Sequence, residues 1–168
     1  MKTKVRVGDD SVSLEYQAST TGDDAALFVC AHGAGGSMTD KATLATAAAM
    51  RTAGLGVARF NFVYKERKSG RPDPMPKLKA TITAVVNEIR ERMTPKQLII
   101  GGRSMGGRAA SMLAADGFNA DGLLLLAYPL HPAGQPEKLR DAHLPEIKMP
   151  VIQFSGTRDP MCTRSLME

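Results

Sequence analysis

The spacing of apolar and polar residues predicts a leading hairpin followed by buried strands. Val12 to Tyr16 alternates apolar and polar residues, which indicates a strand with one exposed face, and Lys4 to Val7 would pair with it. Later segments are mostly apolar, as are parallel strands covered on both faces. These segments are residues 25–31, 56–62, 97–101, 122–127 and 151–154.

Helical patterns fall between these strands. Ser37 to Asp40 has the composition of a capping box, and an alanine-rich helix follows it and ends near Gly54. A second helix begins near Pro76 and has one apolar face, made of Leu78, Ile82, Val85, Ile89 and Met93. A third runs from Met105 to Ala115. Because strands and helices alternate, we expect an α/β fold with a mostly parallel, doubly wound sheet in a single domain, residues 1–168.

Composition narrows the class of protein. The chain has 168 residues, 43% of them hydrophobic, which is typical of a globular domain with a sizeable core. The first residues are charged and lack the apolar stretch of a secretory signal, and no segment has the length and hydropathy of a membrane span. The two cysteines are too few for a disulfide framework. We therefore expect a cytoplasmic protein with no membrane partner.

The net charge of +5 is modest, and positive residues gather in one segment. They are Lys65, Arg67, Lys68, Arg71, Lys77 and Lys79. Glu66 and Asp73 dilute this charge, and only Tyr64, at its edge, could stack on a base. We therefore expect a solvated loop and no nucleic-acid partner. The sequence has no cluster with metal-ligand spacing and no dinucleotide or phosphate-binding motif, so we expect neither a metal nor a cofactor.

The most informative motif is Gly102-Arg103-Ser104-Met105-Gly106, between the apolar segment 97–101 and a predicted helix. A Gly-x-Ser-x-Gly turn in that place is the nucleophile elbow of serine hydrolases. The turn is so tight that side chains at both glycine positions would collide, and its strain lifts the serine hydroxyl above the sheet. We predict that Ser104 is a nucleophile. The alternative is a glycine-rich turn of an α/β protein without a catalytic role.

Two further segments are predicted to lie at the same edge of the sheet. Residues 32–36, His-Gly-Ala-Gly-Gly, follow an apolar strand, and their glycines would let the backbone approach a substrate closely. Acyl transfer needs hydrogen-bond donors for the oxyanion, and we predict the backbone N–H groups of Met105 and Ala34, with Gly33 as the alternative to Ala34. Asp159 follows the segment 151–154 and has the acid's place in the chain order Ser, Asp, His. Its alternative is an ordinary turn aspartate before a proline.

A base for Ser104 is harder to assign. His32, His131 and His143 all precede Asp159, and no histidine follows it. His32 begins the glycine-rich segment and is expected to brace it. His131 follows a predicted strand and could in principle reach Ser104, although the usual chain order argues against this. His143 lies in a charged stretch that we expect to be solvated.

Together these segments resemble the small α/β-hydrolases related to dienelactone hydrolase, specifically the predicted hydrolases grouped with testis-expressed-protein-like and nonspecific-lethal-complex-subunit-like domains. The matching segments are residues 31–36, 59–62, 101–108, 128–132 and 156–160. The resemblance implies an α/β-hydrolase fold, a Ser104 nucleophile and an Asp159 acid. Family members usually continue with a helix, a last strand and a terminal segment that supplies the histidine. We expect those elements to be missing from this chain.

The leading hypothesis is therefore a serine hydrolase that acts on a small ester or thioester, either active with an unusual base or impaired by loss of the histidine. The competing hypothesis is a non-catalytic hydrolase-like module that binds a partner. The loop from Tyr64 to Met75 would form a wall of the substrate pocket. Without a further strand, residues 151–154 would form an exposed apolar edge, so we also expect a homodimer or aggregate through that edge.

Overall fold

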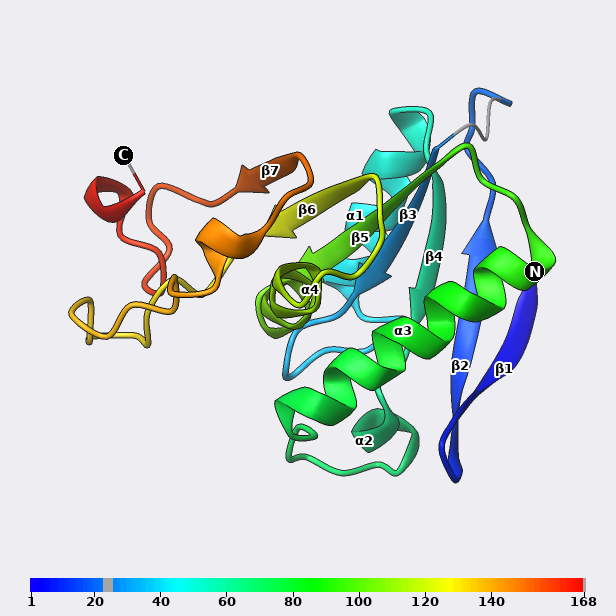
Figure 1. Ribbon diagram of the computed structural model, residues 1–168, viewed down its shortest axis with the longest axis horizontal. Coiled ribbons are helices and arrows are strands. Elements are labelled where there is room, and N and C mark those ends of the chain that lie inside the picture. Colours follow the sequence, from blue (N-terminus) through cyan, green and yellow to red (C-terminus); the bar gives the residue numbers. More distant parts are fainter. Residues whose placement is uncertain (23–25, 168) are drawn as a thin grey trace.

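The centre of the computed structural model, which describes residues 1–22 and 26–167, is a seven-stranded sheet with the order β1-β2-β4-β3-β5-β6-β7 (Figure 1). The strands are β1 (Lys2–Val7), β2 (Asp10–Gln17), β3 (Ala26–Ala31), β4 (Gly56–Phe60), β5 (Gln97–Arg103), β6 (Gly122–Leu126) and β7 (Val151–Phe154). β2 pairs antiparallel with β1 and β4, and the other neighbouring pairs are parallel. The mostly parallel sheet with a leading hairpin is thus confirmed.

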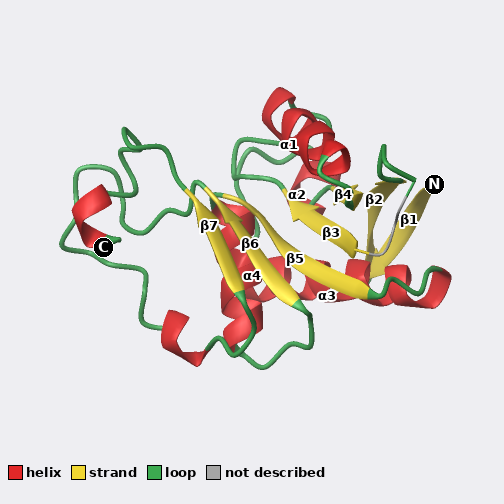
Figure 2. Ribbon diagram, turned by 90° about the horizontal axis from the view of Figure 1, so that it is seen from above, coloured by secondary structure: helices red, strands yellow, loops and turns green. Residues whose placement is uncertain are grey.

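Helices cover both faces of this sheet, as the doubly wound prediction requires. They are α1 (Lys41–Thr52), α2 (Val63–Glu66), α3 (Met75–Arg92) and α4 (Met105–Ala115). Figure 2 shows α1 on one face, with α3 and α4 on the other. The predicted apolar stripe of α3 is buried from Leu78 to Ile89. A smaller core cluster that includes Phe28, Cys30 and Ala47 lies on the α1 face.

The start of α1 differs from the sequence prediction. The helix begins at Lys41, and its N-cap is Asp40 rather than Ser37. The carboxylate of Asp40 accepts hydrogen bonds from the N–H of Ser37 at 2.7 Å and from the N–H of Thr43 at 2.9 Å. Because an aspartate at the N-cap satisfies a free helical N–H, the four residues of the expected capping box form the turn before the helix.

The strand predicted over residues 56–62 is also shorter in the structure. β4 ends at Phe60, and Phe62 is the N-cap of the short helix α2, which the sequence prediction missed. Ala25, the first residue of another predicted strand, lies outside the described residues. The later strand predictions correspond to β5, β6 and β7.

Register brings the carboxyl ends of four parallel strands to one edge. Ala31 of β3 pairs with Gly102 of β5, Arg103 of β5 pairs with Leu126 of β6, and Leu126 pairs with Phe154 of β7. The loops that leave these strands therefore begin side by side. This edge is where ligands bind in open α/β sheets.

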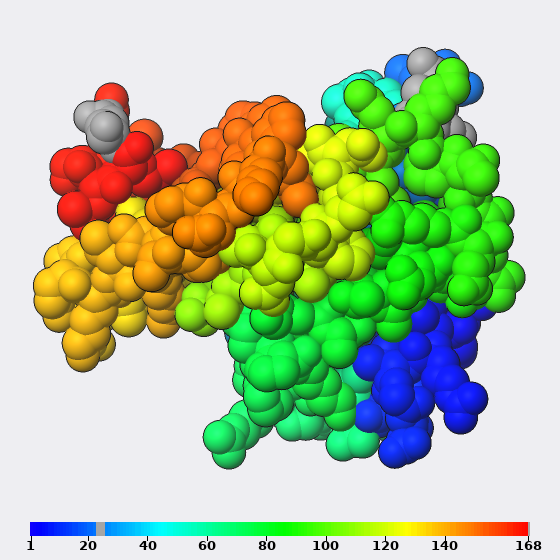
Figure 3. Space-filling view, viewed as in Figure 1, coloured from blue at the N-terminus to red at the C-terminus, as the bar shows by residue number. Residues whose placement is uncertain are grey.

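The C-terminal part of the chain extends from the edge of the sheet formed by β7, opposite the edge formed by β1. Figure 3 shows the segment after β6, coloured yellow to red, projecting from the main body. It contains β7 and the 3-10 helices η1 (Leu144–Glu146) and η2 (Arg164–Leu166). On β7, the side chains of Ile152 and Phe154 are 58% and 59% exposed.

Candidate active site

Ser104 occupies a strained turn between β5 and α4. Its backbone angles are φ 50° and ψ −116°, and its N–H donates to the carbonyl oxygen of Leu126 at 2.9 Å. A non-glycine residue in such a conformation costs roughly 1–3 kcal/mol and persists only where the surroundings hold it. Ala127, after β6, also has a positive φ, of 48°, and lines the same pocket as Ser104. Two strained residues therefore meet at one point on the sheet edge.

The glycines of the Ser104 turn are required by the neighbouring strand. A methyl group on Gly102 would lie 2.1 Å from the carbonyl oxygen of Ala31, and one on Gly106 would lie 2.6 Å from the same oxygen. The prediction from the sequence is that side chains at the two glycine positions would collide with each other. The structure instead shows that the backbone at the end of β3 passes so close to both positions that no side chain fits.

The glycine-rich loop, His32–Gly36, follows β3 and lies against this turn. A methyl group on Gly33 would be 3.6 Å from Cβ of Ser104. Within residues 1–22 and 26–167, the backbone N–H groups of Ala34 and Met105 donate no hydrogen bond. Both groups are thus free to bind a ligand near Ser104.

His32 holds the glycine-rich loop in place. Its ring is buried, Nδ1 is 2.8 Å from the carbonyl oxygen of Gly33, and Nε2 accepts a hydrogen bond from the N–H of Phe62 at 3.2 Å. Because Nε2 is an acceptor, the ring proton is on Nδ1 and is donated to Gly33. Burial lowers the pKa of His32, which favours this neutral form. These contacts are those of the bracing residue that the sequence suggested.

One pocket of about 570 Å³ brings the predicted site residues together. Ala34, Ser104 and Asp159 all line it, and Met105 follows Ser104 as the first residue of α4. Asp159 is partly buried, and its Oδ1 accepts a hydrogen bond from the N–H of Met161 at 2.9 Å. Asp159 thus lies at the predicted edge of the sheet, and its hydrogen bond to a backbone N–H two residues ahead is of the kind that aspartates form in turns.

Positive side chains around this pocket were not predicted from the sequence. Lys41 and Arg103 line it, and Arg103 and Arg158 line an adjoining hollow that also includes Asp159. In the described part of the chain, none of the three cations forms an ion pair. Their clustering around Ser104 is visible only once the loops are folded together.

The other two histidines hydrogen-bond to groups other than Ser104. His131 is buried, with Nε2 accepting a hydrogen bond from the N–H of Thr163 at 3.1 Å. His143 is partly buried rather than solvated as expected, and its Nε2 lies 2.8 Å from the hydroxyl of Ser111. Across the residues that the structure describes, no hydrogen bond joins a histidine to Ser104.

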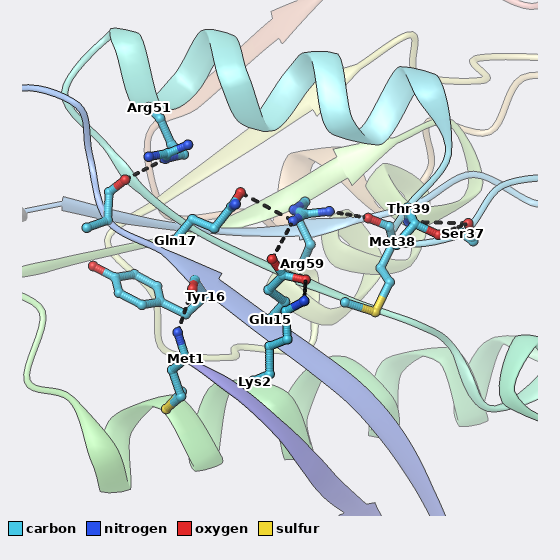
Figure 4. Close-up of polar contacts among 11 residues, drawn as sticks. Met1, Lys2, Glu15, Tyr16, Gln17, Ser37, Met38, Thr39, Arg51 and Arg59 are labelled. Carbon is cyan, nitrogen blue, oxygen red and sulfur yellow. Dashed lines mark hydrogen bonds and ion pairs between the residues drawn. The ribbon is translucent and has the colours of Figure 1, made fainter.

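A buried arginine supports the chain just after the glycine-rich loop (Figure 4). Arg59 of β4 donates to the carbonyl oxygen of Met38 at 2.5 Å and to Gln17 at 3.2 Å, and it forms an ion pair with Glu15 at 3.2 Å. Asn61 accepts a hydrogen bond from the N–H of Met38 at 2.9 Å. Both backbone groups of Met38 are therefore anchored by residues at the end of β4.

The described residues hold neither a candidate metal site nor a candidate membrane span. In residues 1–22 and 26–167 no three or more His, Cys, Asp or Glu side chains are grouped to hold a metal ion. None of the helices in these ranges combines the length and the hydrophobicity needed to cross a bilayer.

Comparison with known proteins agrees with this fold. A family model described as "Alpha/beta hydrolase domain" matches residues 24–168. The α/β serine hydrolase homologue from Coxiella burnetii superposes with a TM-score of 0.81 at 16% identity, covering 99% of this chain and 79% of that one. The lidless α/β serine hydrolase from Xanthomonas campestris gives a TM-score of 0.79 at 18% identity, covering 99% and 76%. Dienelactone hydrolase from Anabaena variabilis gives a TM-score of 0.67 at 14% identity, covering 98% and 89%.

Proposed function

The chain belongs to the α/β hydrolase domain family, and on that premise we propose that it is a serine hydrolase that cleaves small esters or thioesters. The observation that carries the proposal is the strained Ser104, which shares one pocket with Ala34 and Asp159. Strain of this kind is costly, and it is concentrated at sites where a reactive group must be presented.

In the proposed reaction, Ser104 Oγ attacks the carbonyl carbon of the substrate. The carbonyl oxygen becomes an oxyanion and accepts hydrogen bonds from the N–H groups of Ala34 and Met105. The bond to the leaving oxygen or sulfur then breaks, an acyl-serine forms, and water hydrolyses it. Over both steps, the ester and one water give an acid and an alcohol or thiol, with Ser104 regenerated.

Proton transfer distinguishes this site from a complete triad. Since no histidine hydrogen-bonds to Ser104 in the described residues, we propose that the hydroxyl proton passes to the leaving group, directly or through water. An oxyanion hole and binding alone leave about 10³–10⁴-fold acceleration over water in a triad-deficient serine hydrolase. Esters with good leaving groups, such as p-nitrophenyl esters and thioesters, should therefore react fastest.

Labelling with a fluorophosphonate probe, read by intact mass, tests the proposal. Because Ser104 has no histidine to activate it among the described residues, we expect labelling of the wild type to be slow and to reach one probe per chain only on prolonged incubation, with none on Ser104→Ala. No labelling of folded wild-type protein would contradict the proposal. That result would favour the second candidate, a partner-binding module, because in the described residues no histidine hydrogen-bonds to Ser104 to activate it.

A further inference from the structure

The glycine-rich loop receives hydrogen bonds on two consecutive carbonyl oxygens. The hydroxyl of Tyr64 donates to the oxygen of Ala34 at 2.6 Å and lies 3.5 Å from the oxygen of Gly33. The Gly33 oxygen also accepts from His32 Nδ1 at 2.8 Å and from the N–H of Gly36 at 3.0 Å. The rings of His32 and Tyr64 are buried, so both carbonyls point toward the protein interior.

The direction of these carbonyls sets the direction of the following N–H groups. In a trans peptide the C=O and N–H bonds point in opposite directions. The hydrogen bond from His32 Nδ1 to the Gly33 oxygen therefore aims the N–H of Ala34 outward. The hydrogen bond from the Tyr64 hydroxyl to the Ala34 oxygen likewise aims the N–H of Gly35 outward. Among the described residues neither N–H donates a hydrogen bond, and both residues line the pocket of Ser104.

Tyr64 is itself held rigidly. Its backbone N–H donates to Oδ2 of Asp73 at 2.8 Å, and its ring stacks on that of Phe62 with centroids 6.4 Å apart. Burial, with a further contribution from the Asp73 carboxylate, raises the pKa of Tyr64 to about 12. The hydroxyl therefore keeps its proton, and remains a donor, at neutral pH.

We infer that Tyr64 is a positioning residue, whose hydroxyl turns the Ala34–Gly35 peptide so that the N–H of Gly35 joins that of Ala34 as a donor to the oxyanion. This inference rests on the proposed role of Ser104. It also changes the role of Tyr64 from an edge of the pocket wall to a support of the catalytic backbone. Two adjacent outward N–H groups form a small anion-binding concavity, which suits the charge that develops during acyl transfer.

The test replaces only the hydroxyl. Tyr64→Phe keeps the ring and its stacking on Phe62. Tyr128→Phe is the matched control, because Tyr128 is also buried and its hydroxyl also donates to a backbone oxygen, that of Arg140 at 2.7 Å. For each protein we would measure kcat and KM with p-nitrophenyl acetate, and the N–H residual dipolar couplings of the ¹⁵N-labelled chain, which report bond orientation without any need for activity.

In Tyr64→Phe we expect an altered coupling at Gly35, a retained coupling at Ala34 because His32 still holds the Gly33 oxygen, and a kcat lowered by about 10- to 100-fold with little change in KM. Loss of a whole oxyanion donor costs about 100- to 1000-fold, and a misoriented donor should cost less. Tyr128→Phe should leave these couplings and kcat unchanged. A merely structural role for Tyr64 would not separate kcat from KM in this way.

Two results would overturn the inference. An unchanged Gly35 coupling in Tyr64→Phe would mean that the hydroxyl does not orient the peptide, and an altered coupling with an unchanged kcat would mean that the Gly35 N–H is not used. If the wild type does not hydrolyse the ester but the couplings change as expected, the positioning of the loop stands and the proposed function of Ser104 fails.

Discussion

Replacing Arg59 by methionine tests how strongly the chain after the glycine-rich loop is anchored. Arg59 is 2% exposed and contacts Met38, Gln17 and Glu15 (Figure 4). Methionine fills a similar length but donates no hydrogen bond. In Arg59→Met, the carbonyl oxygen of Met38 loses its side-chain donor, and Glu15 loses its buried partner.

The expected cost follows from the burial of this pair. Removing one partner of a buried ion pair costs about 3–5 kcal/mol, because the other charge is left uncompensated. The side chain of Glu15 is 16% exposed and retains Lys2 at 3.5 Å, which places the expected loss near the lower limit, about 3 kcal/mol. For a domain of this size, about 1 kcal/mol shifts Tm by roughly 2–4 °C, so Tm should fall by about 6–12 °C.

Thermal and urea unfolding followed by circular dichroism would measure this change. Arg67→Met is the matched control, because Arg67 is 60% exposed in its ion pair with Asp10 and its loss should cost about 0–1 kcal/mol. Adding Glu15→Gln to Arg59→Met removes the uncompensated carboxylate and should restore part of the loss. If Arg59→Met lowers Tm no more than Arg67→Met, the reasoning about this network is refuted.

Four further predictions concern the site and the surface. Gly106→Ala places a methyl group 2.6 Å from two carbonyl oxygens, so it should destabilise the fold by about 1–3 kcal/mol and abolish probe labelling. Gly70→Ala, whose added methyl group has no atom within 4 Å, should do neither, and equal unfolding midpoints for the Gly106 and Gly70 variants would contradict this. Burial alone would raise the pKa of Glu66, but hydrogen bonds, chiefly those from Ser13 and Lys4, lower it to about 2, below its ordinary value of 4.5. Its stabilising contribution is therefore complete above pH 4.5 and lost as the pH falls toward 2. In that range the urea midpoint of Glu66→Gln should depend less on pH than that of the wild type, and an equal pH dependence in both proteins would argue against this role. The cations around Ser104 should favour esters that carry a carboxylate, so Arg103→Gln should raise KM by about tenfold for p-nitrophenyl hemisuccinate but not for p-nitrophenyl acetate, and an equal effect on both would reject this. The unpaired edge of β7 should associate with a second copy, and Ile152→Lys should prevent it; a wild type that is monomeric by light scattering at high concentration would exclude it.

The Ser104 turn could be predicted from sequence because its requirements are local. A buried strand, a glycine-bounded serine and a helix follow one another within a few residues, and the structure places Ser104 at that junction. The reason for the glycines could not be predicted, because the backbone that excludes a side chain belongs to β3, far away in the sequence. The local sequence therefore indicates the turn, whereas the steric constraint that requires its glycines comes from the neighbouring strand.

The hydrogen bonds of His131 and His143, by contrast, could not be predicted from the sequence. Nothing near His131 or His143 in the sequence indicates that they bind Thr163 and Ser111, since each partner lies 32 residues away. Chain order argued against His131 as the base, and in the described residues His131 forms no hydrogen bond with Ser104; the charged surroundings of His143 predicted a solvated side chain, which the structure instead places against α4. Hydrogen bonds between distant segments depend on packing, which has no periodic signal in the sequence.

The sequence by itself determined the alternation of strands and helices, the antiparallel start of the sheet, and the turn that carries Ser104, because periodicity and turn chemistry depend on neighbouring residues. Only the tertiary structure decided that Ala34, Ser104 and Asp159 line one pocket, that cations surround it, and that Tyr64 supports the loop beside it. These arrangements depend on strand order and register, which bring together loops that leave different strands at the same edge of the sheet.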